Sequence, residues 1–228
     1  MNRAPYERRL DGMIFGMNPR EGFFKGTEFY HPDLRFRMTF PSEWQTVNGK
    51  SAVGAQSPRQ DAAIELTLAQ GANADQAARS FLSQQGVQAG TLTRGTINGL
   101  STAEAPFVAT TQSGTLQGRA VFIEYGNSVF RLLAYGSEAS WSANQSIVQR
   151  ALSSFEPLND PAIVNVQPQR VTLITLDRRT TVAELAQQRP SPVSKATLAL
   201  INQVDESTPL EPGRIVKWVV GRPLPTAP

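Results

Sequence analysis

A run of alternating apolar and polar residues between positions 90 and 135, punctuated at glycines, is the feature that most constrains the fold of this chain. The pattern divides into four strands, at 90–97, 102–111, 116–125 and 128–135. Only Gly126 and Asn127 separate the last two strands, which is typical of a tight hairpin. Strands joined by turns this short are antiparallel neighbours, so the sequence predicts a meandering antiparallel sheet.

Further strands and two helices surround this run. Residues that alternate in polarity or recur at helical spacing predict strands at 34–40, 51–55 and 62–69 and helices at 73–85 and 140–155. Runs of strands with two helices on one face are typical of an α+β sandwich. We place this domain at residues 31–158.

The sequence segments before and after the predicted sandwich are irregular. Residues 1–30 combine glycines with aromatic side chains, apart from one or two helical turns over 6–13. Such a strap covers the following domain, a partner or a missing domain. On the other side, residues 159–169 are rich in Pro, Asn and Asp and predict a semi-rigid linker.

The end of the chain predicts a second, small unit over residues 170–222. Its pattern is strand, helix, helix, strand, at 171–176, 182–188, 195–202 and 215–220, with Thr180 or Thr181 capping the first helix. A βααβ unit of this size is marginally stable alone. Residues 223–228 form a tail.

Composition excludes most catalytic chemistries. The chain has no cysteine and one histidine, His31, which stands beside Pro32 and Asp33 in a predicted turn and is expected to be structural. Two ligands do not hold zinc, so we expect no metal and no cofactor. The neighbouring carboxylates Asp205 and Glu206 lie in a polar turn, where solvated side chains are expected and an acid–base pair is the weaker alternative.

Several binding classes are also disfavoured. Lys and Arg number 22 against 19 Asp and Glu, and they form no basic stripe for nucleic acid. The sequence shows no signal peptide, no apolar run long enough to span a membrane and no glycine loop placed to cradle phosphate. By elimination the chain is expected to be a binding or accessory module, not an enzyme.

One stretch resembles a known family. Residues 11–16 (DGMIFG), 18–22 (NPREG), 29–36 (FYHPDLRF) and 40–44 (FPSEW) look like the segment that follows the catalytic domain in bacterial HtpX-like zinc metallopeptidases, which carry an HExxH motif. That motif is absent here, so no catalytic residue is carried over. The resemblance implies that residues 1–30 are the remnant of an upstream protease domain. It also implies a location in the periplasm or cell envelope.

Two fold resemblances accompany it. The order of elements over 31–158 resembles the PsbP-like α/β/α sandwich, a fold of binding and assembly factors. Residues 170–222 resemble a LysM module, a family that binds N-acetylglucosamine glycans such as peptidoglycan between two loops. Those loops would be 177–181 and 205–213 here, and the family's Gly-Asp-Thr is replaced by Arg178-Arg179-Thr180. The glycan-binding residues that this resemblance implies are Asp177, Arg178, Thr180, Pro209 and Leu210.

Two functions follow as expectations. The first is a non-catalytic accessory region that positions a zinc metallopeptidase through protein contacts, with the upstream protease domain or other envelope proteins as partners. The alternative is a peptidoglycan-binding module that acts through the LysM-like unit.

Overall fold

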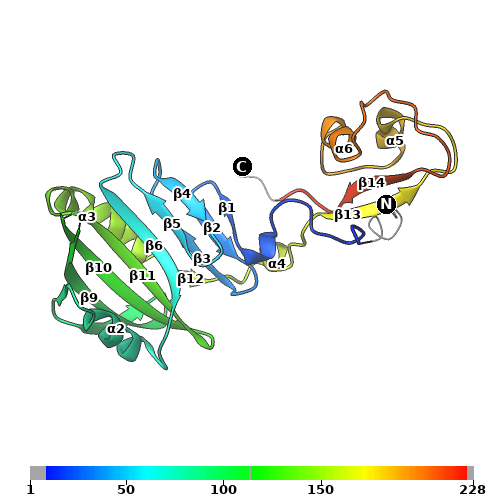
Figure 1. Cartoon of the computed structure of the whole chain (residues 1–228). Coiled ribbons are helices and arrows are strands. Elements are labelled where there is room, and N and C mark those ends of the chain that lie inside the picture. The colour runs from blue at the N-terminus through cyan, green and yellow to red at the C-terminus, as the bar shows by residue number, and fades with distance from the viewer. Residues whose placement is uncertain (1–8, 113, 225–228) are drawn as a thin grey trace. The chain divides into compact units, whose positions relative to one another are not determined.

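The computed structural model describes residues 9–112 and 114–224 and divides the chain into two compact units (Figure 1). The first, here called the sandwich unit, is Phe23–Asn159. The second combines Met1–Gly22 with Asp160–Pro228 and is here called the βααβ unit. The expectations for residues 1–8 and for 225–228 of the tail lie outside the described residues.

The described residues of the sandwich unit form two antiparallel sheets and two helices. The smaller sheet has the order β1-β2-β3-β12, and the larger has the order β4-β5-β6-β11-β10-β9-β7, with β8 also paired to β9. The elements are β1 (Phe23–Lys25), β2 (Glu28–His31), β3 (Phe36–Thr39), β4 (Gln45–Asn48), β5 (Val53–Gln56), β6 (Ala62–Ala69), α2 (Ala74–Leu82), β7 (Val87–Ala89), β8 (Thr93–Ile97), β9 (Leu100–Thr111), β10 (Gly114–Tyr125), β11 (Ser128–Ser137), α3 (Glu138–Leu152) and β12 (Glu156–Pro157). The predicted antiparallel α+β class is confirmed.

The hairpin between β10 and β11 sets the register of the larger sheet. Tyr125 pairs with Ser128 across the two-residue turn, and Gly126 adopts a φ of 60°, which glycine reaches without steric cost. Pairing then continues along both strands as far as Leu116 with Ser137. The hairpin predicted at Gly126 and Asn127 is therefore confirmed.

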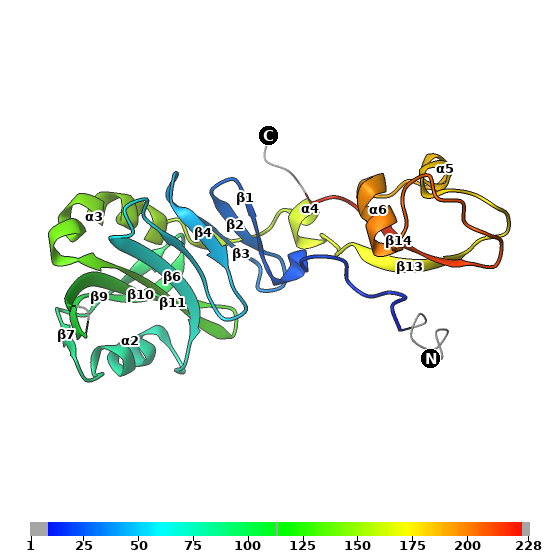
Figure 2. The same ribbon diagram turned by 45° about the horizontal axis from the view of Figure 1, so that its top comes forward.

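The two helices cover opposite faces of the larger sheet (Figure 2). Along β10, Val121 and Ile123 belong to the core beneath α3, while Ala120 and Phe122 belong to the core beneath α2. Successive residues of a strand point to opposite faces, so both faces of this strand are apolar. The expectation of two helices on one face is wrong, and the α/β/α layering describes the unit.

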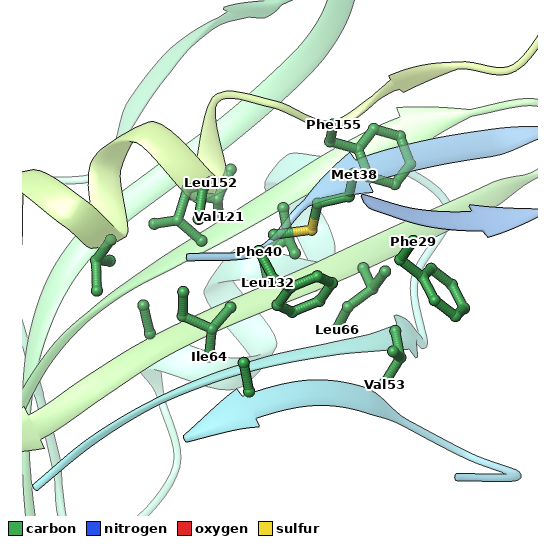
Figure 3. Packing of buried hydrophobic residues seen from close by; sticks show 14 of the residues in the cluster. Phe29, Met38, Phe40, Val53, Ile64, Leu66, Val121, Leu132, Leu152 and Phe155 are labelled. Atoms are coloured by element: carbon green, nitrogen blue, oxygen red, sulfur yellow. The ribbon is translucent and has the colours of Figure 1, made fainter. Parts of the chain in front are cut away.

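The main core lies between the larger sheet, α3 and the smaller sheet, as Figure 3 shows. Phe155 is 0% exposed and stacks on Phe36, with ring centroids 4.9 Å apart and planes 16° apart. The ring centroid of Phe130 lies 5.1 Å from that of Phe155 and 5.0 Å from that of Phe36. This aromatic cluster joins β3, β11 and the segment after α3.

The structure divides the predicted strap at Gly22 instead of ending it at residue 30. Residues 23–25 and 28–31 are β1 and β2, joined by a two-residue turn in which Gly26 has a φ of 61°. Their aromatic side chains enter the core of the sandwich unit, since Phe23 and Phe29 are 2% and 1% exposed. This half of the strap is therefore a hairpin of the sandwich, whose boundary lies at 23 and not at 31.

The βααβ unit has the predicted order of elements. The elements are β13 (Arg170–Thr175), α5 (Val182–Gln188), α6 (Lys195–Ile201) and β14 (Ile215–Val220), and β13 and β14 are antiparallel. Two short helices precede them, the 3-10 helix η1 (Pro19–Glu21) and α4 (Pro161–Val164). The predicted linker 159–169 is partly folded, because Asp160 caps α4, which buries Ile163 and Val164. The core contains Trp218, which is 1% exposed, between the sheet and both longer helices.

The first half of the predicted strap pairs with the outer edge of β13. Val171 N–H donates to Met13 O and Gly12 N–H donates to Val171 O, both at 2.8 Å, while Leu173 N–H donates to the Asp11 carboxylate at 3.1 Å. Phe15 packs against the core of the same unit. The predicted helical turns do not extend over residues 9–12, which form non-helical turns and lead into this pairing. Residues 11–15 therefore act as an added strand of the βααβ unit.

The outer edge of β14 is occupied by side chains. The Asn202 amide donates to Lys217 O and accepts from Lys217 N–H, each at 2.8 Å, and the Ser191 hydroxyl donates to Val219 O at 2.8 Å. Unpaired edge strands invite pairing with other chains. Both edges of this small sheet are thus closed within the unit.

Tyr30, in the smaller sheet of the sandwich unit, is expected to make the protein less stable at alkaline pH. Tyr30 is 8% exposed, and its hydroxyl donates to the Glu28 carboxylate at 2.5 Å. Burial, then this hydrogen bond and then the Glu28 charge raise the pKa of Tyr30 above its usual 10.0. The pKa of Tyr30 is higher in the folded protein than in the unfolded chain. The contribution of the protonated hydroxyl to the free energy of unfolding is therefore complete below pH 10 and is lost as the pH rises beyond it. We expect the urea midpoint to fall between pH 8 and about pH 11, and to fall less in Tyr30→Phe. Equal falls in both proteins would contradict this assignment.

Candidate functional site

The two loops expected to bind glycan meet at one end of the βααβ unit. Thr180 N–H donates to Leu210 O at 3.2 Å and Leu210 N–H donates to Thr180 O at 2.8 Å, which forms an isolated antiparallel bridge. The two bridged residues lie thirty positions apart in sequence, so this bridge is what places the loops side by side. We call loops 177–181 and 205–213 the loop pair.

A capping box fixes the end of the first loop. The Thr181 hydroxyl accepts from Glu184 N–H at 3.1 Å, and the Glu184 carboxylate accepts from Thr181 N–H at 3.0 Å. The same carboxylate accepts from the Thr180 hydroxyl at 3.0 Å. The start of α5 therefore holds the loop in one conformation.

The structure separates the five predicted glycan-binding residues into two groups. Thr180 and Leu210 are 7% and 0% exposed, and Leu210 belongs to the apolar core. Asp177, Arg178 and Pro209 are exposed. Thr180 and Leu210 therefore join the two loops through their backbones, while the side chains of the other three residues are exposed to solvent.

Arg178 and Arg179 lie in the first loop where the LysM family has glycine and aspartate. Neither has a positive φ, so the loop does not require glycine at these positions. The Arg178 guanidinium donates to Gln188 at 2.8 Å, which directs it along α5. The loop therefore accommodates both arginines without a left-handed backbone conformation.

Sequence reasoning missed an ion pair that crosses the loop pair. Arg179 Nε lies 3.2 Å from Glu211 Oε1, and both side chains are about two-thirds exposed. Arg179 directly follows Arg178, and Glu211 directly follows Leu210. Their opposite charges, next to two predicted site residues, could have indicated this ion pair. Exposed pairs of this kind contribute about 0.2–1 kcal/mol. Its role is to orient two polar groups at the surface of the loops.

The alternative sites from the sequence have structural roles. His31 Nδ1 accepts from Leu34 N–H at 3.2 Å and so closes the turn after β2. Asp205 O accepts from Thr208 N–H and Glu206 O accepts from Ala183 N–H, so both residues shape the second loop through their backbones. Across residues 9–112 and 114–224, no three His, Asp or Glu side chains gather as metal ligands.

The described part of the chain contains no helix of the length and apolarity needed to cross a membrane.

Comparisons with known proteins concern the fold. No family model matches the sequence, and no curated protein matches it. Among solved structures, the chain is similar to cyanobacterial PsbP (CyanoP) from Synechocystis sp. PCC 6803, with 14% identity and a TM-score of 0.45 over 57% of this chain and 91% of that one.

Two further structures are similar. One is LpqN, involved in cell envelope biogenesis of Mycobacterium tuberculosis, with 11% identity and a TM-score of 0.44 over 54% of this chain and 83% of that chain. The other is the Saccharomyces cerevisiae Ran-binding protein Mog1p, with 11% identity and a TM-score of 0.41 over 60% of this chain and 96% of that chain.

Proposed function

We propose that the βααβ unit binds glycans containing N-acetylglucosamine, such as peptidoglycan, through the loop pair. The bridge between Thr180 and Leu210 carries this proposal, because it brings together the two loops between which LysM modules bind their ligand. The resemblance of residues 170–222 to a LysM module and the observed βααβ order support it.

The exposed side chains of the loop pair match the chemistry of such a ligand. Asp177 accepts hydrogen bonds from sugar hydroxyls and Arg178 donates them to hydroxyl or acetamido oxygens. Pro209 offers an apolar surface to the face of a sugar ring. The capping box at Thr181 and Glu184 keeps the first loop ordered before binding, which lowers the entropic cost of association.

A sedimentation assay on insoluble peptidoglycan tests this function. We expect the purified chain to sediment with the polymer and Arg178→Ala to reduce its affinity about tenfold, the range expected for one hydrogen bond to a charged group. Arg222→Ala is the matched control, because Arg222 is an exposed arginine that follows β14, at the end of this strand away from the loop pair. The proposal fails if the chain stays in the supernatant, or if Arg178→Ala binds as well as the control.

A second candidate follows from the resemblance of residues 11–44 to the HtpX-like segment. We propose that the chain is a non-catalytic accessory region that positions an envelope zinc metallopeptidase, with the upstream protease domain or other envelope proteins as partners. The supporting observation is that both units use this stretch: residues 11–15 pair with β13, and 23–31 form β1 and β2. Stoichiometric zinc binding together with casein cleavage by this chain would contradict it.

A further inference from the structure

The sandwich unit contains a cavity of about 660 Å³ that no sequence motif indicated. Its walls are the last turns of α3, the loop 40–44 after β3, and the loop 57–61 between β5 and β6. Phe40 and Ile147 supply apolar lining. Sites for small organic ligands have volumes of about 300–1,000 Å³, so the cavity has room for one.

Two nearly buried side chains leave polar atoms unpaired in this cavity. Trp44 and Asn144 line it and are 8% and 7% exposed. Asn144 Nδ2 donates to Ser140 O at 3.0 Å, but within the described residues its Oδ1 accepts no hydrogen bond and the Trp44 indole N–H donates none. Both atoms keep some exposure to solvent, because neither is among the fully buried atoms that have no partner. Two residues that line the cavity therefore carry one donor and one acceptor without a partner among the described residues.

A secondary amide carries one acceptor and one donor, so it offers a partner to each of these two atoms. Its carbonyl accepts from the Trp44 indole N–H, and its N–H donates to Asn144 Oδ1. Buried polar groups that gain a partner on binding recover the cost of their desolvation, so this pairing selects an amide over an apolar ligand.

Charges at the rim of the cavity add a second requirement. Arg59 and Asp61 neutralise each other, with Arg59 Nε 3.2 Å from Asp61 Oδ2. Arg150 and Glu43 are exposed, and the described part of the chain provides neither with an ion-pair partner. One free cation and one free anion beside an amide site complement a ligand with one carboxylate and one ammonium group.

We infer that this cavity binds a short peptide with free termini. An amide bond of the peptide pairs with Trp44 and Asn144, its carboxylate pairs with Arg150, and its ammonium group pairs with Glu43. The site lies wholly within the sandwich unit and is independent of the loop pair.

Titration with trialanine, followed in ¹H–¹⁵N spectra, tests the inference. The chain has three tryptophans, Trp44, Trp141 and Trp218, so three indole N–H signals are expected, and Trp44→Phe identifies one of them while keeping an aromatic ring. We expect trialanine to move the Trp44 signal downfield and saturably. Arg150→Ala should raise the dissociation constant about tenfold through loss of one charge-assisted pair. Gln145→Ala, exposed on the same helix, should leave it unchanged.

Blocked peptides and sugars distinguish the alternatives. N-acetyl-trialanine amide keeps the amides but loses both charges, so it should bind about tenfold more weakly or worse. A Trp44 signal that trialanine does not move would overturn the inference. It would also be overturned if the blocked peptide bound equally well, or if tri-N-acetylchitotriose moved the signal in place of trialanine.

Discussion

Trp218→Ala should unfold the βααβ unit and leave the sandwich unit folded. Trp218 is 1% exposed and is the largest fully buried side chain of the unit, in contact with a core that includes Leu198 and Leu210. Truncating a buried aromatic side chain costs about 3–5 kcal/mol. A core this small supplies little more than that, about 3–5 kcal/mol in total. The variant therefore removes most or all of the unit's stability.

Amide hydrogen exchange measures this effect in each unit separately. Protection of β13 and β14 should disappear in Trp218→Ala, while protection of β10 and β11 should persist. Val220→Ala, on the same strand but 41% exposed, is the control and should change the free energy of unfolding by less than about 1 kcal/mol. Loss of protection in both units together would contradict the division into two folding units.

Phe155→Ala should produce the largest loss of stability in the sandwich unit. Phe155 is 0% exposed and contacts Phe36 and Phe130, so its removal leaves a cavity bounded by three elements that cannot easily collapse. The expected cost is about 3–5 kcal/mol. With a urea dependence of about 2 kcal/mol per M, the midpoint should fall by about 2 M.

Urea unfolding of a matched variant gives the reference for this loss. Val47→Ala removes an apolar side chain that is 61% exposed on β4, and it should shift the free energy of unfolding by less than about 0.5 kcal/mol. Equal midpoints for Phe155→Ala and Val47→Ala would show that the aromatic cluster is not the centre of the core.

Local signals predicted the elements that local sequence determines. The turn at Gly126 and a helix cap at Thr180 or Thr181 are short-range signals: the turn is present, and Thr181 is the cap. The same hairpin rule applies to Gly26 and Thr27, where Lys25 pairs with Glu28. The sequence nevertheless predicts an irregular strap there, because the aromatic residues around Gly26 do not alternate with polar ones.

Long-range pairings could not be predicted in this way. Residues 11–15 pair with a strand more than 150 positions later, and no local pattern specifies that partner. Trp44 and Asn144 line one cavity although they are 100 residues apart in the chain. In the loop pair, periodicity could not tell that Leu210 faces the core, since its loop has no regular period.

Titration with tri-N-acetylchitotriose tests the proposed glycan binding most directly. In ¹H–¹⁵N spectra of the whole chain, we expect backbone amide signals of residues 177–181 and 205–213 to move with a common dissociation constant. The same signals should move only at about tenfold higher concentration in Arg178→Ala. Signals of the loop pair that stay in place, or that move equally in both proteins, would contradict the account.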